Sequence, residues 1–209
     1  MDERIITGPA CIEEGTAWLA RRDEALARAR AETGPWPDRL RTGGFPALVQ
    51  AIVSQQVSVA SARAIGARVE AAGLHDPIVV RAAEDELFKG CGLSRPKVRY
   101  VRALAEAGID FDSLAHAPSE EVVATLVAVP GIGRWTAEIY ALFSLGRADV
   151  FPAGDLALQE AARLLYGLDG RPTERQLREM AEAWQPWRGV AARGLWAWYA
   201  LTKKREGVD

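Results

Sequence analysis

The sequence predicts an all-α fold, an orthogonal bundle of helices joined by short loops. Apolar residues recur at helical spacing along most of the chain. We find no stretch of alternating β-branched residues flanked by hairpin turns, so a sheet is not expected. Glycine and proline clusters separate the helical segments at short intervals.

Composition places the chain among ordinary soluble proteins. Its 209 residues suffice for one large domain or two small lobes, and 49% are hydrophobic and 26% charged. No apolar run is long enough to span a bilayer, and no secretory signal follows the polar first residues, so we expect a cytoplasmic protein. Cys11 and Cys91 cannot by themselves ligate an iron–sulfur cluster, and we expect no required cofactor.

In the first half of the chain, capping and stop signals delimit the helices. Residues 13–32 are rich in Ala, Leu, Arg and Glu, and a Gly-Pro-Trp-Pro run at 34–37 ends that segment. Ser58 is expected to cap the helix that Gly73 ends. The helices expected here are 13–32, 46–56, 59–72, 83–89 and 96–107.

In the second half, two proline- and glycine-containing segments interrupt the helices. The first is the tight turn 130–133, and the second is the loop 146–154, which leads to Asp155. The helices expected around them are 119–127, 134–145, 156–166, 174–183 and 188–203.

The turn 130–133, Pro-Gly-Ile-Gly, joins two helices. Its glycines permit positive φ and leave the backbone N–H groups of the second helix accessible, where the helix dipole is positive. Such a site suits a phosphate oxygen, although Gly-x-Gly alone is more often a plain connection between helices.

Four motifs in order resemble the helix-hairpin-helix DNA glycosylase superfamily, and within it the bacterial 3-methyladenine DNA glycosylase II family. They are Leu126–Ala137, Val150–Asp155, Ala51–Ala60, and Trp184–Arg188 followed by Trp196. The resemblance runs from about Trp18 to Tyr199. It implies two helical lobes with a DNA-binding cleft between them. We expect residues 44–145 to form the lobe with the hairpin, and residues 1–43 and 146–209 to form the lobe with Asp155.

The resemblance also implies contacts to the DNA backbone at the hairpin and at the segment 92–97. In relatives, carbonyls of the hairpin turn hold a sodium or potassium ion that bridges to phosphate, which here would be those of Val127, Val129 and Ile132. The residues expected at the DNA backbone are Gly131, Gly133, Arg134, Thr136, Ser94 and Lys97.

Asp155 stands where the family carries its catalytic carboxylate. A fixed anion stabilises the positive charge that develops on the sugar as the N-glycosidic bond breaks, and it can orient the attacking water. Asp is also a favoured helix cap, and both roles are compatible.

Trp135 bears on the type of reaction and on the substrate. Relatives that also cut the DNA backbone place a lysine at this position, and no lysine lies between Lys97 and Lys203, so we expect hydrolysis without lyase activity. Cationic methylated purines favour an aromatic wall, for which the candidates are Trp135, Trp196 and Tyr140 or Trp198. Helical aromatics more often fill the core, to which we assign Trp18, Trp184 and Trp187.

Gln56 matches the residue that enters the DNA gap once the damaged base has left the stack. It could also be a polar helix terminus. Further arginines are weaker candidates for phosphate contacts, since each is more often a solvated surface residue: Arg63, Arg95, Arg188 and Arg193.

Together these motifs predict a monomeric glycosylase that removes alkylated bases from duplex DNA and so begins base excision repair. The net charge of −2 argues mildly against a nucleic-acid partner, although local charge matters more than the total. Two alternatives remain open: a non-catalytic module that binds distorted DNA, and a glycosylase for oxidised or mismatched bases.

Overall fold

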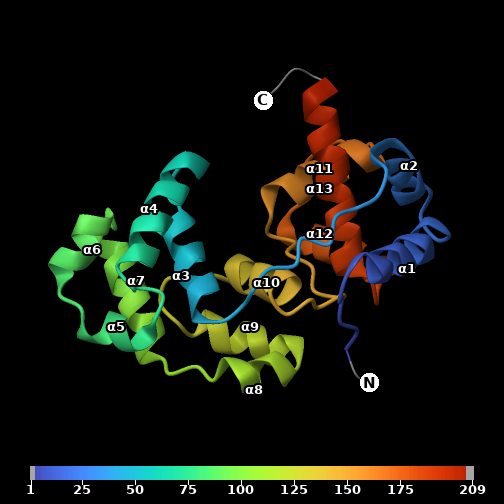
Figure 1. The fold of residues 1–209 in the computed structure, drawn as a ribbon. Helices are drawn as coiled ribbons and strands as arrows, with labels where there is room; N and C mark the ends of the chain where they lie inside the picture. Colours follow the sequence, from blue (N-terminus) through green and yellow to red (C-terminus); the bar gives the residue numbers. More distant parts are fainter. Residues whose placement is uncertain (1–2, 206–209) are drawn as a thin grey trace. The chain divides into compact units, whose positions relative to one another are not determined.

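The computed structural model describes residues 3–205, and apart from an isolated bridge between Ile5 and Arg147 every regular element in that range is helical (Figure 1). The predicted all-α class is therefore confirmed. The chain forms two compact units, with boundaries between residues 41 and 42 and between 140 and 141, whereas the sequence predicts them at 43/44 and 145/146. No helix of the described range is both long and apolar enough to cross a membrane.

Unit 1 combines the two ends of the chain, residues 3–41 and 141–205. Helix α13 is its centre, and α1, α2 and α11 pack against it (Figure 1). Trp184 and Trp187 are buried in its core, as the sequence predicts, while Trp18 is partly buried against it. The helices of unit 1 are α1 (Pro9–Ala20), α2 (Glu24–Thr33), α11 (Leu156–Tyr166), α12 (Glu174–Ala181), the short 3-10 helix η1 (Glu182–Trp184) and α13 (Arg188–Arg205).

The single helix predicted over residues 13–32 is wrong, because the chain breaks between α1 and α2 at Asp23. Oδ1 of Asp23 accepts the backbone N–H of Leu26 at 3.0 Å and so caps α2. Its Oδ2 accepts the hydroxyl of Tyr166 at 2.6 Å and the indole N–H of Trp184 at 2.9 Å. These distant partners fix the break, and helix propensity alone does not reveal them.

Unit 2 is the continuous segment 42–140. Helix α3 packs on α4 and α7, and α5 packs on α7 (Figure 1). Its helices are α3 (Phe45–Ser54), α4 (Val59–Ala71), α5 (Pro77–Ala82), α6 (Asp85–Cys91), α7 (Arg95–Glu106), α8 (Phe111–His116), α9 (Ser119–Val127) and the part of α10 (Arg134–Phe143) that ends at Tyr140.

Two short helices of unit 2, α5 and α8, are absent from the sequence prediction. Each begins after an aspartate that caps it: Asp76 accepts the N–H of Ile78 at 2.7 Å, and Asp110 accepts those of Asp112 and Ser113. The predicted cap at Ser58 is confirmed, since its hydroxyl accepts the N–H of Ser61. The two missed helices have too few residues for a periodic apolar pattern, so only their caps could have signalled them.

Candidate active site and DNA interface

The hairpin turn between α9 and α10 requires glycine at residue 131. Gly131 has φ 91°, and a Cβ there would lie 2.2 Å from Cγ of Tyr100 on α7. The turn closes through a hydrogen bond of 3.1 Å from the N–H of Ile132 to the carbonyl of Val129. The backbone therefore passes against the Tyr100 ring, where a side chain does not fit.

Gly133 is a different case, because a Cβ at this position meets nothing within 4 Å in the protein. Its carbonyl accepts the N–H of Ala137 at 3.0 Å, so Gly133 stands directly before the first turn of α10. Packing within the protein thus does not explain the glycine, whereas close approach of a ligand to the backbone would.

The first turn of α10 presents two exposed side chains and buries the third. Arg134 is exposed and donates from Nε to Oε1 of Glu138 at 3.0 Å. The side chain of Trp135 is 47% exposed, so it does not fill the core of unit 2. Thr136 is buried, with 8% exposure, and its contact with the DNA backbone stays a prediction. Tyr140, farther along α10, is buried beside Phe111, with its hydroxyl accepting the N–H of Gly44 at 2.8 Å.

The loop between α3 and α4, residues 55–58, contains the predicted gap-filling residue. Gln56 is exposed and has φ 56°, a conformation that costs a residue with a side chain about 1–2 kcal/mol. Nε2 of Gln55 donates to the carbonyl of Gly131 at 2.9 Å, which joins this loop to the hairpin turn. Strained backbone of this kind persists where its surroundings fix it, and it is frequent at functional sites.

The start of α7 lies beside the same region. The ammonium of Lys97 donates to the carbonyl of Val53 at 2.7 Å, in the last turn of α3, and burial lowers the pKa of this lysine. Ser94 is exposed at the N-terminus of α7. The structure thus brings the hairpin turn, the 55–58 loop and the start of α7 together within unit 2.

Asp155 ends the loop that leads into α11, and its carboxylate caps that helix. Oδ1 accepts the N–H groups of Ala157 at 2.9 Å and Leu158 at 3.0 Å. The indole N–H of Trp196, on α13, donates to the same oxygen at 3.2 Å. The capping role that sequence reasoning allows is therefore present, and the carboxylate is held in a fixed orientation while remaining partly exposed.

Trp196 is half-buried and packs against other side chains of unit 1. Its ring packs on Phe143 with a centroid separation of 5.7 Å, and the guanidinium of Arg193 lies 4.8 Å from the centre of the Phe143 ring. Arg193 is 1% exposed, and its guanidinium donates to the carbonyls of Asp38, Gly189 and Leu142. Burial lowers its pKa to about 10.

Two of the arginines proposed from sequence as phosphate contacts have partners inside unit 1. Arg193 is buried, and Arg188 forms ion pairs with Asp149 at 2.8 Å and Glu182 at 3.2 Å. Arg193 is therefore neither a phosphate contact nor the solvated surface residue that the sequence favours, whereas Arg188 is partly exposed and its role as a phosphate contact stays a prediction. Arg95 is exposed at the start of α7.

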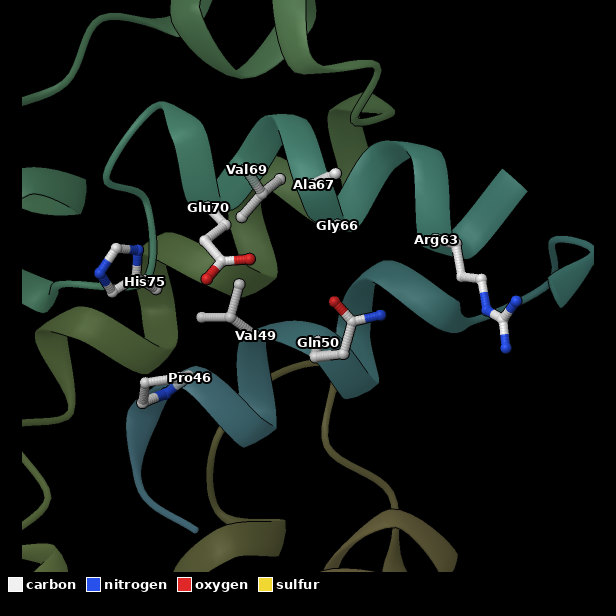
Figure 2. A pocket seen from close by; sticks show the side chains of 9 residues that line it. All are labelled: Pro46, Val49, Gln50, Arg63, Gly66, Ala67, Val69, Glu70 and His75. Carbon is white, nitrogen blue, oxygen red and sulfur yellow. The ribbon is translucent and has the colours of Figure 1, made fainter. Parts of the chain in front are cut away.

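Arg63 lies at one end of a surface groove of about 610 Å³ between α3 and α4 (Figure 2). Val49 and Val69 form apolar walls of this groove, with Glu70 and His75 at its other end (Figure 2). The groove contains none of the other residues that the sequence singles out.

No group of three or more His, Cys, Asp or Glu side chains suited to a metal ion occurs in residues 3–205. The predicted cation site uses backbone carbonyls instead. Of these, the carbonyl of Val129 already accepts the N–H of Ile132, and a carbonyl oxygen has a second lone pair that an ion could use. The carbonyl of Val129 thus keeps a lone pair for such an ion, and the sodium or potassium site stays a prediction.

Sequence reasoning missed two hydrogen bonds of candidate functional residues, one in each unit: the bond from Gln55 to Gly131 in unit 2 and the bond from Trp196 to Asp155 in unit 1. Each joins residues far apart in the chain. The Gln55-Gln56 pair at the end of an apolar helix was the available signal for the first contact, whereas no local pattern indicates the second.

Comparison with known proteins identifies relatives over nearly the whole chain. Residues 49–186 match the family model described as HhH-GPD superfamily base excision DNA repair protein. DNA-3-methyladenine glycosylase 1 of Schizosaccharomyces pombe is 32% identical over 203 residues, which cover 93% of this chain and 89% of that protein.

Solved structures agree with this result. The DNA-3-methyladenine glycosidase of Bacillus halodurans has 32% identity and a TM-score of 0.82, covering 98% of this chain and 95% of its own. The 3-methyladenine DNA glycosylase of Schizosaccharomyces pombe, solved in complex with abasic DNA, has 29% identity and a TM-score of 0.78. Here the alignment covers 91% of this chain and 97% of that one.

Proposed function

Because the chain belongs to the HhH-GPD superfamily of base excision DNA repair proteins, we propose that it is a monofunctional DNA glycosylase for alkylated bases. Its substrates would be bases such as 3-methyladenine and 7-methylguanine in duplex DNA. This substrate class is supported by the relatives, which are named 3-methyladenine glycosylases or glycosidases and one of which was solved in complex with abasic DNA.

The observation that carries the proposal is the fixed carboxylate of Asp155. Two backbone N–H groups and the indole of Trp196 hold one of its oxygens. An oriented anion stabilises the positive charge that develops on the deoxyribose as the bond from C1′ to the base nitrogen breaks. Asp155 then accepts the proton of the attacking water, whose oxygen bonds to C1′ while the base leaves with the bonding electron pair.

The remaining residues would bind DNA and expose the base. The backbone N–H groups around Gly131 and Gly133 bind phosphate oxygens of one strand, and the exposed guanidinium of Arg134, which is ion-paired with Glu138, contacts the same strand. The base must leave the stack before it reaches a carboxylate, and Gln56 fills the gap that it vacates. The exposed ring of Trp135 offers an aromatic face to a cationic methylated purine.

The proposal excludes a lyase step because the chain supplies no amine at the hairpin. Trp135 occupies the position where lyase relatives are expected to carry lysine, and Lys97 is engaged with the carbonyl of Val53. Cleavage through a Schiff base needs a free amine at C1′. The product is then an intact strand with an abasic site.

The experiment compares the parent protein with Asp155→Asn on methylated duplex DNA. We expect the parent to release 3-methyladenine and 7-methylguanine and to leave the strand uncut until heat or alkali is applied. Asp155→Asn keeps a capping oxygen but loses the charge, so it should still bind DNA and release about 10²–10³-fold less base. Binding without release by the parent would indicate a non-catalytic DNA-binding module, and release of 8-oxoguanine alone would indicate a different lesion.

The aromatic wall is tested separately with Trp135→Ala. Trp135 is 47% exposed, so the melting temperature of the variant is measured beside its activity to separate a loss of stability from the loss of the aromatic face. Loss of stacking and of cation–π attraction should slow release of cationic 7-methylguanine by about 10-fold, and release of a neutral base such as hypoxanthine by less. Equal effects on both bases would show that Trp135 does not provide the aromatic face for the cationic base.

A further inference from the structure

The bond between the 55–58 loop and the hairpin turn has a consequence for how the protein would open DNA. The carboxamide of Gln55 donates to the carbonyl of Gly131 at 2.9 Å, across 76 positions of the chain. Gln55 itself is in extended conformation directly after α3, and Gln56 follows with φ 56°. The residue that makes the bond is thus the immediate neighbour of the residue proposed to enter the gap.

Both ends of this bond are held in place by other contacts. On the hairpin side, the backbone of Gly131 lies against the ring of Tyr100, and the turn closes through the bond from Ile132 to Val129. On the loop side, Lys97 binds the carbonyl of Val53 in the last turn of α3. The 55–58 loop can therefore not rotate about the end of α3 without breaking the bond from Gln55 to Gly131.

We propose that Gln55 is a positioning residue that fixes the gap-filling residue Gln56 relative to the DNA-binding hairpin. The hairpin's hold on a DNA strand then sets the place at which Gln56 enters the duplex. This inference rests on the proposed glycosylase function. It assigns Gln55 no contact with the reacting atoms, and its effect passes through Gln56.

Two substitutions of similar length remove the donor. Gln55→Met keeps the volume of the side chain, and Gln55→Glu places a carboxylate against the carbonyl of Gly131. The matched control is Gln50→Met, on the helix that precedes Gln55. The Gln50 carboxamide donates to Oγ of Ser54 at 3.2 Å and lines the groove between α3 and α4 (Figure 2).

The first readout is single-turnover release of 7-methylguanine from duplex DNA. We expect both Gln55 variants to lower this rate by about 10- to 100-fold, since small misplacements of a group that prepares the substrate have effects of that size. The affinity of Gln55→Met for an abasic duplex should change by less than about 3-fold, because this variant adds no charge and leaves the hairpin itself unaltered. The control Gln50→Met should retain the parent's rate.

The second readout separates positioning from a general structural effect. A 2-aminopurine placed opposite an abasic-site analogue reports by fluorescence whether a side chain has entered the gap. We expect the fluorescence change on binding to be lost in Gln55→Met, as it is in Gln56→Ala. In the Gln56→Ala background, Gln55→Met should have no further effect on the release rate, because two residues that act as one unit are not additive.

Several results would overturn the proposal. One is a parental release rate and fluorescence change in both Gln55 variants, and another is a full addition of the two single effects in the double variant. If the parent itself releases no base, the proposed function fails. The bond from Gln55 to Gly131 is then tested by measuring amide hydrogen exchange of residues 55–58 in the free protein. Faster exchange in Gln55→Met than in Gln50→Met would support the positioning role, and equal exchange would reject it.

Discussion

Two turns of this protein are built alike and end differently. Residues 129–133, Val-Pro-Gly-Ile-Gly, lead into α10, and residues 151–155, Phe-Pro-Ala-Gly-Asp, lead into α11. Each turn begins with a buried apolar residue followed by proline. The carbonyl of the last residue of each turn, Gly133 or Asp155, accepts the first hydrogen bond of the following helix at 3.0 Å. The first turn ends in Gly133, which has no side chain, and the second ends in Asp155, which caps its own helix.

The difference shows how one local structure serves two kinds of chemistry. The positive end of a helix attracts an anion. At α11 the protein supplies that anion itself, and capping holds the Asp155 carboxylate in the orientation required for catalysis. At α10 a glycine leaves the same position open to an anion from outside, which we propose to be a DNA phosphate. Substitutions within the two turns, and of the Trp196 side chain that binds Asp155, test this difference.

The largest effect is expected at the second turn. Asp155→Asn and Asp155→Ala should both lower base release by about 10²–10³-fold, since each removes the charge. Only Asp155→Ala also removes the cap, so it alone should lower the free energy of unfolding, by about 1 kcal/mol. Activity is measured by base release and stability by urea denaturation. Asp76→Asn, a cap replacement at α5, is the control and should leave both unchanged.

The next largest effect is a loss of folding stability when the first turn is altered. Gly131→Ala places a methyl group at φ 91° and against the ring of Tyr100. We expect a loss of about 3 kcal/mol in the free energy of unfolding, combining backbone strain with overpacking. Denaturant titration measures this loss. A variant as stable as the parent would show that the turn tolerates rearrangement and that Gly131 serves the ligand alone.

A smaller effect, on binding, is expected when the first turn is made to resemble the second. Gly133→Asp supplies α10 with its own anion in a position where the protein has room. Stability should hold or rise, while affinity for duplex DNA should fall by about 10²-fold, because the new carboxylate would repel the phosphate. Gly133→Ala is the uncharged control, with an expected loss of about 10-fold. Unchanged DNA affinity in both variants would place the phosphate elsewhere.

The smallest effect is expected from the partner of the carboxylate. Trp196→Phe keeps an aromatic ring on Phe143 but loses the N–H that donates to Asp155. The loss of one hydrogen bond to a charged group corresponds to about 1.5 kcal/mol, which is about a 10-fold fall in kcat. KM should change little, because the phenylalanine keeps the aromatic ring that would contact the base. A rise in KM with constant kcat would instead identify Trp196 as a binding residue.

Local patterns predicted most helices and both turns, yet they failed where distant contacts decide the structure. The break at Asp23 depends on Tyr166 and Trp184, which lie more than a hundred residues away. Arg193 resembles a surface arginine in sequence, but three backbone carbonyls hold it in the core. Thr136 belongs to the hairpin motif but is buried on α10.

The sequence by itself determined the helical class and the positions of the two turns, because helical periodicity, caps and glycine turns depend on neighbouring residues. The candidate carboxylate came from the resemblance to the glycosylase family, since the local pattern around Asp155 indicates only a helix cap. Only the tertiary structure decided that Gln55 binds the hairpin turn and that Trp196 binds Asp155. These bonds join segments 76 and 41 residues apart. Their geometry arises when helices pack, and packing depends on the whole core rather than on any local stretch of sequence.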